Sequence, residues 1–317
     1  MGFQRCVADP CVYIKQGKDI SYCLVYVDDI LYMHNNEREE QECASGLKRY
    51  MQTKCLGPVQ EYLGMHVIHD NNGGFILHQG SKIEQLLADS KMADCNEMKT
   101  PMSVSFQNET EGDYFTDPDL YRQIIGKLQY LAKVTRPDIA NAVSILCRKV
   151  DKPTEKDWRG VKRVVRYLKG TVNYGLALSA VATGNLACYV DADHAGDKNN
   201  RKSTAGVLIM FHGYTIDWFS RKQTLVATSS TEAEYISLSM ACHKLNWYEL
   251  LMEEAQIKIQ KPIRVYEDNQ SCIRLAESEA NNRRTKHVSV RFHHVRDCVQ
   301  SKLIKLIYVN TKDADAC

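Results

Sequence analysis

Apolar positions recur with two different periods along the C-terminal half of the chain. Over residues 186–191 apolar side chains occupy every second position, which is typical of a strand with one buried face. Over 231–254 they recur every three or four residues, which predicts a helix. Short strands are also expected around residues 263–266 and 303–309. The C-terminal part of the chain therefore alternates strands with helices.

In the middle of the chain the apolar residues recur with the period of an α-helix. Two helices are expected over residues 119–150, separated at Arg136-Pro137 because proline cannot continue a helix in regular form. A third helix opens after Thr154, which is well placed as its N-cap. Residues 94–118 have the weakest core signal and several turn-forming residues, so they predict a long connector.

A hairpin is expected near the N-terminus. Residues 20–33 contain two strongly β-forming runs with Asp28 and Asp29 between them. Two adjacent charges cost stability between apolar strands unless water or a cation compensates them. The local pattern fits an exposed turn and a functional acidic pair equally well.

Composition describes a folded, intracellular chain. Of 317 residues, 44% are hydrophobic and 25% charged, which is ordinary for globular proteins and long enough for two domains, or one domain and a remnant. The 12 cysteines form no Cys-x-x-Cys pair and predict reduced thiols rather than a disulfide frame or a zinc site. No apolar run is long enough for a membrane span, so no membrane partner is expected.

Two basic clusters stand out, although the net charge is only +2. Most such charge runs are simply solvated faces, but cations spaced along one helix also suit contact with nucleic-acid phosphates. The first cluster follows Thr154 and comprises Arg159, Lys162, Arg163, Arg166 and Lys169. The second is expected on the outward face of a helix near the C-terminus and comprises Lys286, His287, Arg291, His294 and Arg296.

Three acidic positions fall at the ends of predicted elements. Asp191 ends a strand, Glu232 and Glu234 lie in the first turns of a helix, and Asp268 ends another strand. Carboxylates gathered from separate elements repel one another unless a cation lies between them, so the set suggests a divalent metal. The alternative is local: the glutamates would favour the helix dipole, and Asp268 or Asn269 would cap the next helix.

An ordered series of motifs spans this region. They are Asp191-Ala-Asp193, Ala195-Gly196-Asp197, Arg201-Lys-Ser-Thr-Ala-Gly206, Trp218-Phe-Ser-Arg-Lys-Gln223, Ser229-Ser-Thr-Glu-Ala-Glu-Tyr235, Glu267-Asp-Asn-Gln-Ser271 and Thr285-Lys-His287. With them, residues 185–315 resemble the ribonuclease H domain of copia-type LTR retrotransposon Pol polyproteins. The resemblance implies that Asp191, Glu234 and Asp268 bind metal, with Glu232 as the alternative glutamate. Asp315 is the best match to the family's fourth metal-binding acid, with Asp313 as its substitute.

The N-terminal part resembles the same polyproteins. Tyr26-Val27-Asp28-Asp29 is similar to the palm hairpin of reverse transcriptases, and Tyr62-Leu63-Gly64 also stands where the family has it. The family's polymerases need a further aspartate and a fingers subdomain, both upstream of Met1. We therefore expect Asp28 and Asp29 to be a remnant polymerase site without polymerase activity.

The resemblance implies an α/β (α+β) protein in three segments. These are a partial palm with a primer-grip-like hairpin over 1–80, a helical thumb and connection over 81–181, and a ribonuclease H-like mixed sheet with flanking helices over 182–317, short at its C-terminus. The implied reaction is two-metal hydrolysis of the RNA strand of RNA–DNA hybrids, with two Mg²⁺ or Mn²⁺ ions. The expected partner is a hybrid or duplex nucleic acid. The alternatives are a non-catalytic nucleic-acid-binding remnant and a decayed transposon product.

Overall fold

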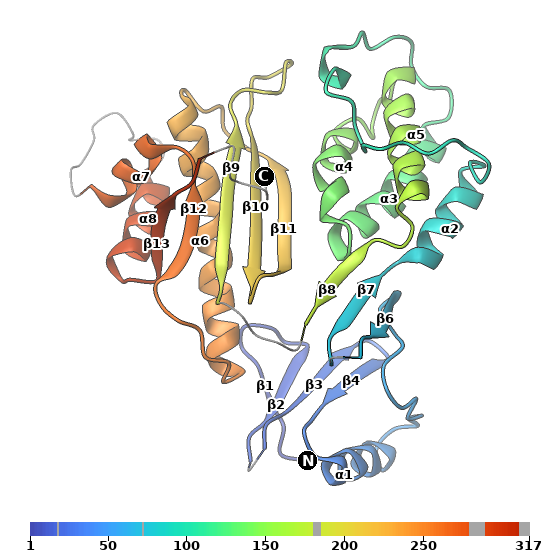
Figure 1. The fold of residues 1–317 in the computed structure, drawn as a ribbon, viewed down its shortest axis with the longest axis vertical. Coiled ribbons are helices and arrows are strands. Elements are labelled where there is room, and N and C mark those ends of the chain that lie inside the picture. Colours follow the sequence, from blue (N-terminus) through green and yellow to red (C-terminus); the bar gives the residue numbers. More distant parts are fainter. Residues whose placement is uncertain (18, 72, 180–184, 279–288, 311–317) are drawn as a thin grey trace. The chain divides into compact units, whose positions relative to one another are not determined.

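The chain folds into two compact units. The computed structural model describes residues 1–317 except 18, 72, 180–184, 279–288 and 311–317. One unit contains residues 1–67 and 243–259, and the other contains 68–242 and 260–317. The long helix α6 (Ser230–Glu254), labelled in Figure 1, has its residues up to Cys242 in the second unit and those from His243 in the first.

The first unit contains the expected N-terminal hairpin. Its antiparallel sheet has the strand order β1-β2-β3-β4 and is followed by a helix and two short strands. Tyr26 pairs with Asp29, so Val27 and Asp28 form the turn, with Val27 in the left-handed region at φ 55°. The elements are β1 (Gln4–Arg5), β2 (Val12–Lys15), β3 (Ser21–Tyr26), β4 (Asp29–Met33), α1 (Glu37–Lys48), β5 (Glu61–Tyr62) and β6 (Met65–His69), of which the last two residues already belong to the second unit.

A helical bundle forms the first part of the second unit. The predicted break at Arg136-Pro137 is present, and Thr154 caps the third expected helix in a capping box with Asp157. The elements are β7 (Phe75–His78), α2 (Gly80–Asp89), η1 (Phe106–Asn108), α3 (Pro118–Val134), η2 (Pro137–Ile139), α4 (Ala140–Cys147), α5 (Glu155–Gly170) and β8 (Gly175–Leu178), with β7 and β8 paired antiparallel.

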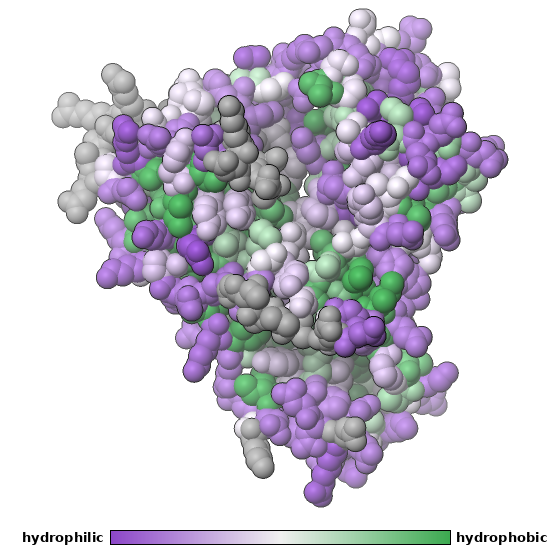
Figure 2. All heavy atoms as spheres, in the orientation of Figure 1, coloured by the Kyte–Doolittle hydropathy of each residue, from purple (hydrophilic) through white to green (hydrophobic). Residues whose placement is uncertain are grey.

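Apolar stripes on these helices close into one core. Its fully buried members include Leu86, Ile124, Leu128, Leu146, Val161 and Leu168. Each stripe has the three-to-four-residue spacing that places side chains on one helix face, so burial of that face stabilises the bundle. The outer surface is mostly hydrophilic in the view of Figure 2.

A mixed five-stranded sheet follows, with the order β11-β10-β9-β12-β13 (Figure 1). Strands β9 to β11 pair antiparallel, whereas β9, β12 and β13 run parallel. The elements are β9 (Ala187–Asp193), β10 (Thr204–Phe211), β11 (Tyr214–Lys222), β12 (Ile263–Glu267), α7 (Gln270–Glu277), α8 (Ser289–Gln300) and β13 (Ile304–Tyr308). The predicted mixed α/β fold class is confirmed, while the boundaries of the three predicted segments stay a prediction.

The parallel pairing of β9 with β12 sets the position of the acidic residues. Parallel neighbours end at the same edge of a sheet, so Asp191 near the end of β9 and Asp268 after β12 come to that edge together. The first part of α6, up to Cys242, buries apolar residues such as Leu238 in this unit, and Tyr235 stacks on Phe292 of α8 at a centroid distance of 4.0 Å. The sheet and α6 therefore form one scaffold for the acids.

One expected surface residue of α8 is buried. Arg296 was predicted on the outward face, but it is 9% exposed. It lies four residues after the buried Phe292, and residues at that spacing share a helix face. The prediction for Arg296 is therefore wrong.

Within the described part of the chain, no helix combines the length and the apolar character that crossing a membrane requires.

Candidate metal centre

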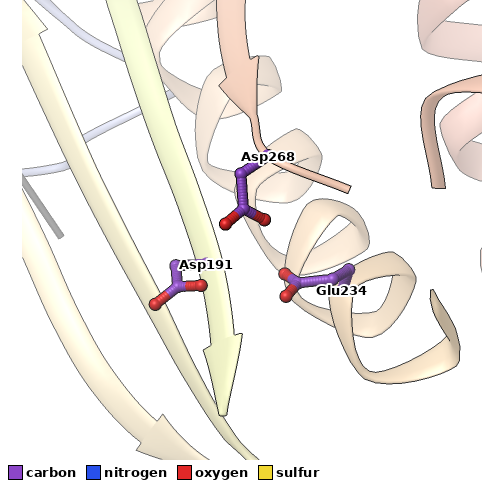
Figure 3. A group of neighbouring side chains, drawn as sticks. All are labelled: Asp191, Glu234 and Asp268. Atoms are coloured by element: carbon purple, nitrogen blue, oxygen red, sulfur yellow. The ribbon is translucent and has the colours of Figure 1, made fainter. Parts of the chain in front are cut away.

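Three carboxylates from three elements meet at one point of the second unit. Asp191, Glu234 and Asp268 each offer an oxygen atom, and these atoms all lie within 4.8 Å of one another. Figure 3 shows the three side chains converging from a strand, a helix and the residue after a strand. The arrangement offers hard oxygen ligands, which Mg²⁺ and Mn²⁺ prefer.

The structure distinguishes the two glutamates at the start of α6. The carboxylate of Glu232 accepts hydrogen bonds from the Thr228 backbone N–H at 2.7 Å and the Thr228 hydroxyl at 2.6 Å. Glu232 thus satisfies polar groups at the N-terminal end of the helix. Glu234 lies two residues later and is the glutamate that joins the acidic cluster.

Asp268 and Asn269, the two residues after β12, have different structural roles. The Asn269 side chain accepts a hydrogen bond from the Cys272 backbone N–H at 3.0 Å and so caps α7. Asp268 is not the capping residue, and its carboxylate lies in the cluster with Asp191 and Glu234. The capping alternative raised from the sequence therefore applies to Asn269.

Burial and mutual repulsion disfavour the charged forms of the acids. Burial, followed by the neighbouring Asp268, raises the pKa of Asp191 above its usual value. Burial together with nearby carboxylates, Glu267 first among them, raises the pKa of Glu234 to about 9. Among the described residues, Glu234 Oε2 is buried without a hydrogen-bond partner. A bound cation would satisfy this oxygen and compensate the repulsion, so the residues fit a divalent metal.

Sequence reasoning missed a fourth acid beside this cluster. Glu267 is fully buried, and the backbone N–H of Asn269 donates to Glu267 Oε1 at 3.0 Å. Burial is the main cause that raises the pKa of Glu267 to about 8. The alternation of the strand could have indicated its burial. Ile263, Val265 and Glu267 occupy every second position, and the first two of these three residues are apolar and buried. That period places Glu267 on the buried face.

Other predicted acids lie elsewhere or outside the described residues. Asp28 and Asp29 are exposed at the β3–β4 hairpin of the first unit. Asp313 and Asp315, matched to the fourth metal-binding acid, fall outside the residues that the structure describes.

The basic face of α5 is partly covered rather than open. Arg163 donates from Nε to the Thr100 carbonyl at 3.2 Å, and Arg166 donates to the Asn96 carbonyl at 2.5 Å. Lys169 donates to the Cys95 carbonyl at 2.8 Å. Connector residues, whose contacts could not be read from periodicity, therefore lie against this helix.

The remaining cations are less constrained. Arg159 faces Glu109 at 3.8 Å and is exposed, whereas Lys162 is half-buried. In the second cluster Arg291 is half-buried near the start of α8, while Lys286 and His287 fall outside the described residues. Binding of nucleic acid by these residues stays a prediction.

The comparisons with known proteins place this fold in a family. Residues 1–104 match the family model described as "Reverse transcriptase (RNA-dependent DNA polymerase)". Almost the whole chain, 99%, is 36% identical to the Pol polyprotein from transposon RE1 of Arabidopsis thaliana and 33% identical to that from transposon TNT 1-94 of Nicotiana tabacum. The chain spans only 21% and 24% of the length of these two relatives.

A solved structure is similar as well. The foamy viral protease-reverse transcriptase in complex with dsDNA has 17% sequence identity and a TM-score of 0.46, over 91% of this chain and 55% of that one. The two polyproteins match nearly the whole chain, and the reverse-transcriptase model matches its first third. The chain belongs to the family of Pol polyproteins from copia-type retrotransposons.

Proposed function

We propose that this chain hydrolyses the RNA strand of RNA–DNA hybrids with divalent metal held by Asp191, Glu234 and Asp268. The observation that carries the proposal is their convergence within 4.8 Å, together with the unpartnered buried oxygen of Glu234. Asp315 is proposed as a fourth ligand on the resemblance of its motif alone.

Each acid contributes differently to the site. Asp191 and Asp268 stand at one edge of adjacent parallel strands, so the sheet fixes the separation of their carboxylates. Glu234 approaches from α6 and is held in the buried part of the cluster. Divalent ions, when bound in such a site, activate water and stabilise the charge that develops on the leaving 3′-oxygen.

Hybrid binding needs positive charge around this acidic centre. We propose that Lys286, His287 and Arg291 contact the phosphates of the hybrid, because they precede or begin α8 and are cationic or can become so. The exposed Arg159 of α5 is proposed as a further phosphate contact.

The test is cleavage of a hybrid labelled on its RNA strand, in Mg²⁺, by the wild-type chain and by Asp191→Asn. We expect metal-dependent cleavage of the RNA strand in the hybrid and its loss in the variant. Asp191→Asn also controls for contaminating nucleases, because any such activity would survive the substitution. Single-stranded RNA and duplex DNA of the same sequence serve as substrate controls.

Two results would contradict the proposal. Equal cleavage by both proteins would assign the activity to something other than this centre. A wild-type protein that melts cooperatively and binds hybrid in a strongly salt-dependent manner, yet does not cleave it, would favour a nucleic-acid-binding function instead.

A further inference from the structure

A cavity of about 400 Å³ lies between α5 and the connector that covers it. One wall is cationic and comes entirely from α5, through Arg159, Lys162, Arg163 and Arg166. The other wall is largely apolar and includes Met92, Met98 and Phe106. None of the acids of the metal centre lines this cavity.

The positive charge of the cavity is incompletely compensated. Arg163 donates to the carbonyl and, at 2.8 Å, to the hydroxyl of Thr100, while Arg166 donates to the carbonyl of Asn96. These acceptors are neutral, so they orient the guanidinium groups without cancelling their charge. Glu109 is the acid that lines the cavity, and its carboxylate stands 3.8 Å from Arg159.

Lys162 completes the cationic wall. Within the described residues, no hydrogen bond or ion pair occupies its ammonium group. A half-buried ammonium beside two oriented guanidinium groups favours an anion with several oxygen atoms. Phosphate has this chemistry.

The apolar wall consists of the partly buried Met92 and Met98 and a small exposed part of Phe106, whose side chain otherwise lies in the bundle core. Phe106 packs directly against α5, since a Cβ added at Gly160 would lie 2.8 Å from a ring carbon of Phe106. Gly160 therefore allows the aromatic side chain to approach the helix beside the cations. Aromatic and methionine side chains make favourable contacts with the faces of nucleobases and other rings. The volume is within the range of small-molecule sites, roughly 300–1,000 Å³.

We propose that this cavity binds a nucleotide, with its phosphate on the α5 cations and its base against Met92 and Met98, beside the exposed part of Phe106. The site contains none of the three acids of the candidate metal centre, and it shares only Arg159 with the hybrid contacts proposed above. The same chemistry has two sources, namely a free nucleotide and the 5′-phosphorylated end of a nucleic-acid strand.

The experiment measures binding by calorimetry in EDTA, so that metal-dependent binding elsewhere does not contribute. The probes are AMP, ATP and a short 5′-phosphorylated single-stranded oligonucleotide, with inorganic phosphate and adenosine as partial ligands. The test variant is Lys162→Glu. Its matched control is Lys133→Glu, the same charge change at an exposed position of α3 in the same unit. Thermal melts establish that both variants fold.

We expect Lys162→Glu to weaken binding by about tenfold or more, while Lys133→Glu binds as the wild type does; tenfold corresponds to about 1.4 kcal/mol. Binding of AMP or ATP would identify a free-nucleotide site, and binding of the oligonucleotide alone would identify a strand-end site. The proposal is overturned if neither class of probe binds more tightly than inorganic phosphate. It is equally overturned if the two lysine variants have the same affinity.

Discussion

This chain has two sets of acidic residues, one adjacent in the sequence and the other close together only in the folded structure. Asp28 and Asp29 are adjacent along the chain and lie exposed at a hairpin. Asp191, Glu234 and Asp268 are separated by dozens of residues, yet their oxygens lie within 4.8 Å. Water can solvate the first pair, whereas the second set is buried or half-buried, so either protonation or a bound cation has to offset the repulsion of its charged forms.

The difference arises from the elements that carry the acids. The hairpin projects its turn into solvent, and no further acid of the described residues joins Asp28 and Asp29 in a metal-binding group. In the second unit, parallel strands and the start of α6 bring their ends to the same edge. Substitutions at the two sets should therefore have very different consequences.

The largest expected effect is on cleavage. Glu234→Gln should lower the rate of hybrid cleavage by more than roughly 100-fold, since loss of even an outer-shell partner of a metal ligand commonly costs 10–100-fold. Asp29→Asn, the same kind of change in the exposed set, should leave the rate unchanged. Rates measured under single-turnover conditions with excess enzyme compare the two. Comparable rates for Glu234→Gln and the wild type would remove Glu234 from the site.

The next largest effect distinguishes the structural role of Glu232 from the proposed metal-binding role of Glu234. Glu232→Ala should destabilise the fold by about 1 kcal/mol, because it removes the acceptor of the Thr228 N–H and hydroxyl at the end of the helix. Hybrid cleavage by the folded fraction should remain near the wild-type rate. Urea unfolding gives the first quantity and the cleavage assay the second. Loss of activity without loss of stability would mean that Glu232 acts in the metal centre.

A smaller effect concerns pH. The pKa values of Glu234 and Glu267 are raised from 4.5 to about 9 and about 8, chiefly by burial. In EDTA the folded protein therefore retains protons that the unfolded chain has released, and these groups make stability fall as pH rises from about 5 to 9. Melting temperatures across this range should fall less steeply in Glu267→Gln than in the wild type. An identical slope in the two proteins would show that Glu267 does not titrate as its environment implies.

The smallest effect is expected in the exposed set. Asp28→Asn should change the free energy of unfolding by less than about 0.5 kcal/mol, because the side chain lies at an exposed turn. Urea unfolding in EDTA provides the comparison. A large stabilisation in this variant would indicate that neighbouring carboxylates repel the charge of Asp28 in the folded state, contrary to its exposed position.

The strands and the helix that carry the three acids could be predicted from the sequence. The period of two around Val190, the helical period from Thr231 and the strand before Asp268 are all local properties, and each element formed where it was expected. The choice between Glu232 and Glu234 needed the structure, because both lie in the first turns of one helix. Only the three-dimensional contacts show Glu232 bound to Thr228.

The covered face of α5 could not be predicted in the same way. Its cations bind backbone carbonyls at Cys95, Asn96 and Thr100. Every residue carries a carbonyl, so such acceptors leave no mark in the side-chain pattern. The connector also lacks a regular hydrophobic period, and its placement against a helix more than 60 positions away is a non-local property.

In the proposed function Asp191, Glu234 and Asp268 form one divalent-metal site. The most direct test titrates Mn²⁺ into the EDTA-treated and desalted protein and follows both bound Mn²⁺ by electron paramagnetic resonance and the melting temperature. We expect saturable binding that stabilises the wild type, by about 2.7 kcal/mol at a free concentration 100-fold above Kd. Binding and stabilisation should be lost in Asp191→Asn and retained in Asp29→Asn. Equal Mn²⁺ affinity in Asp191→Asn and the wild type would contradict the account.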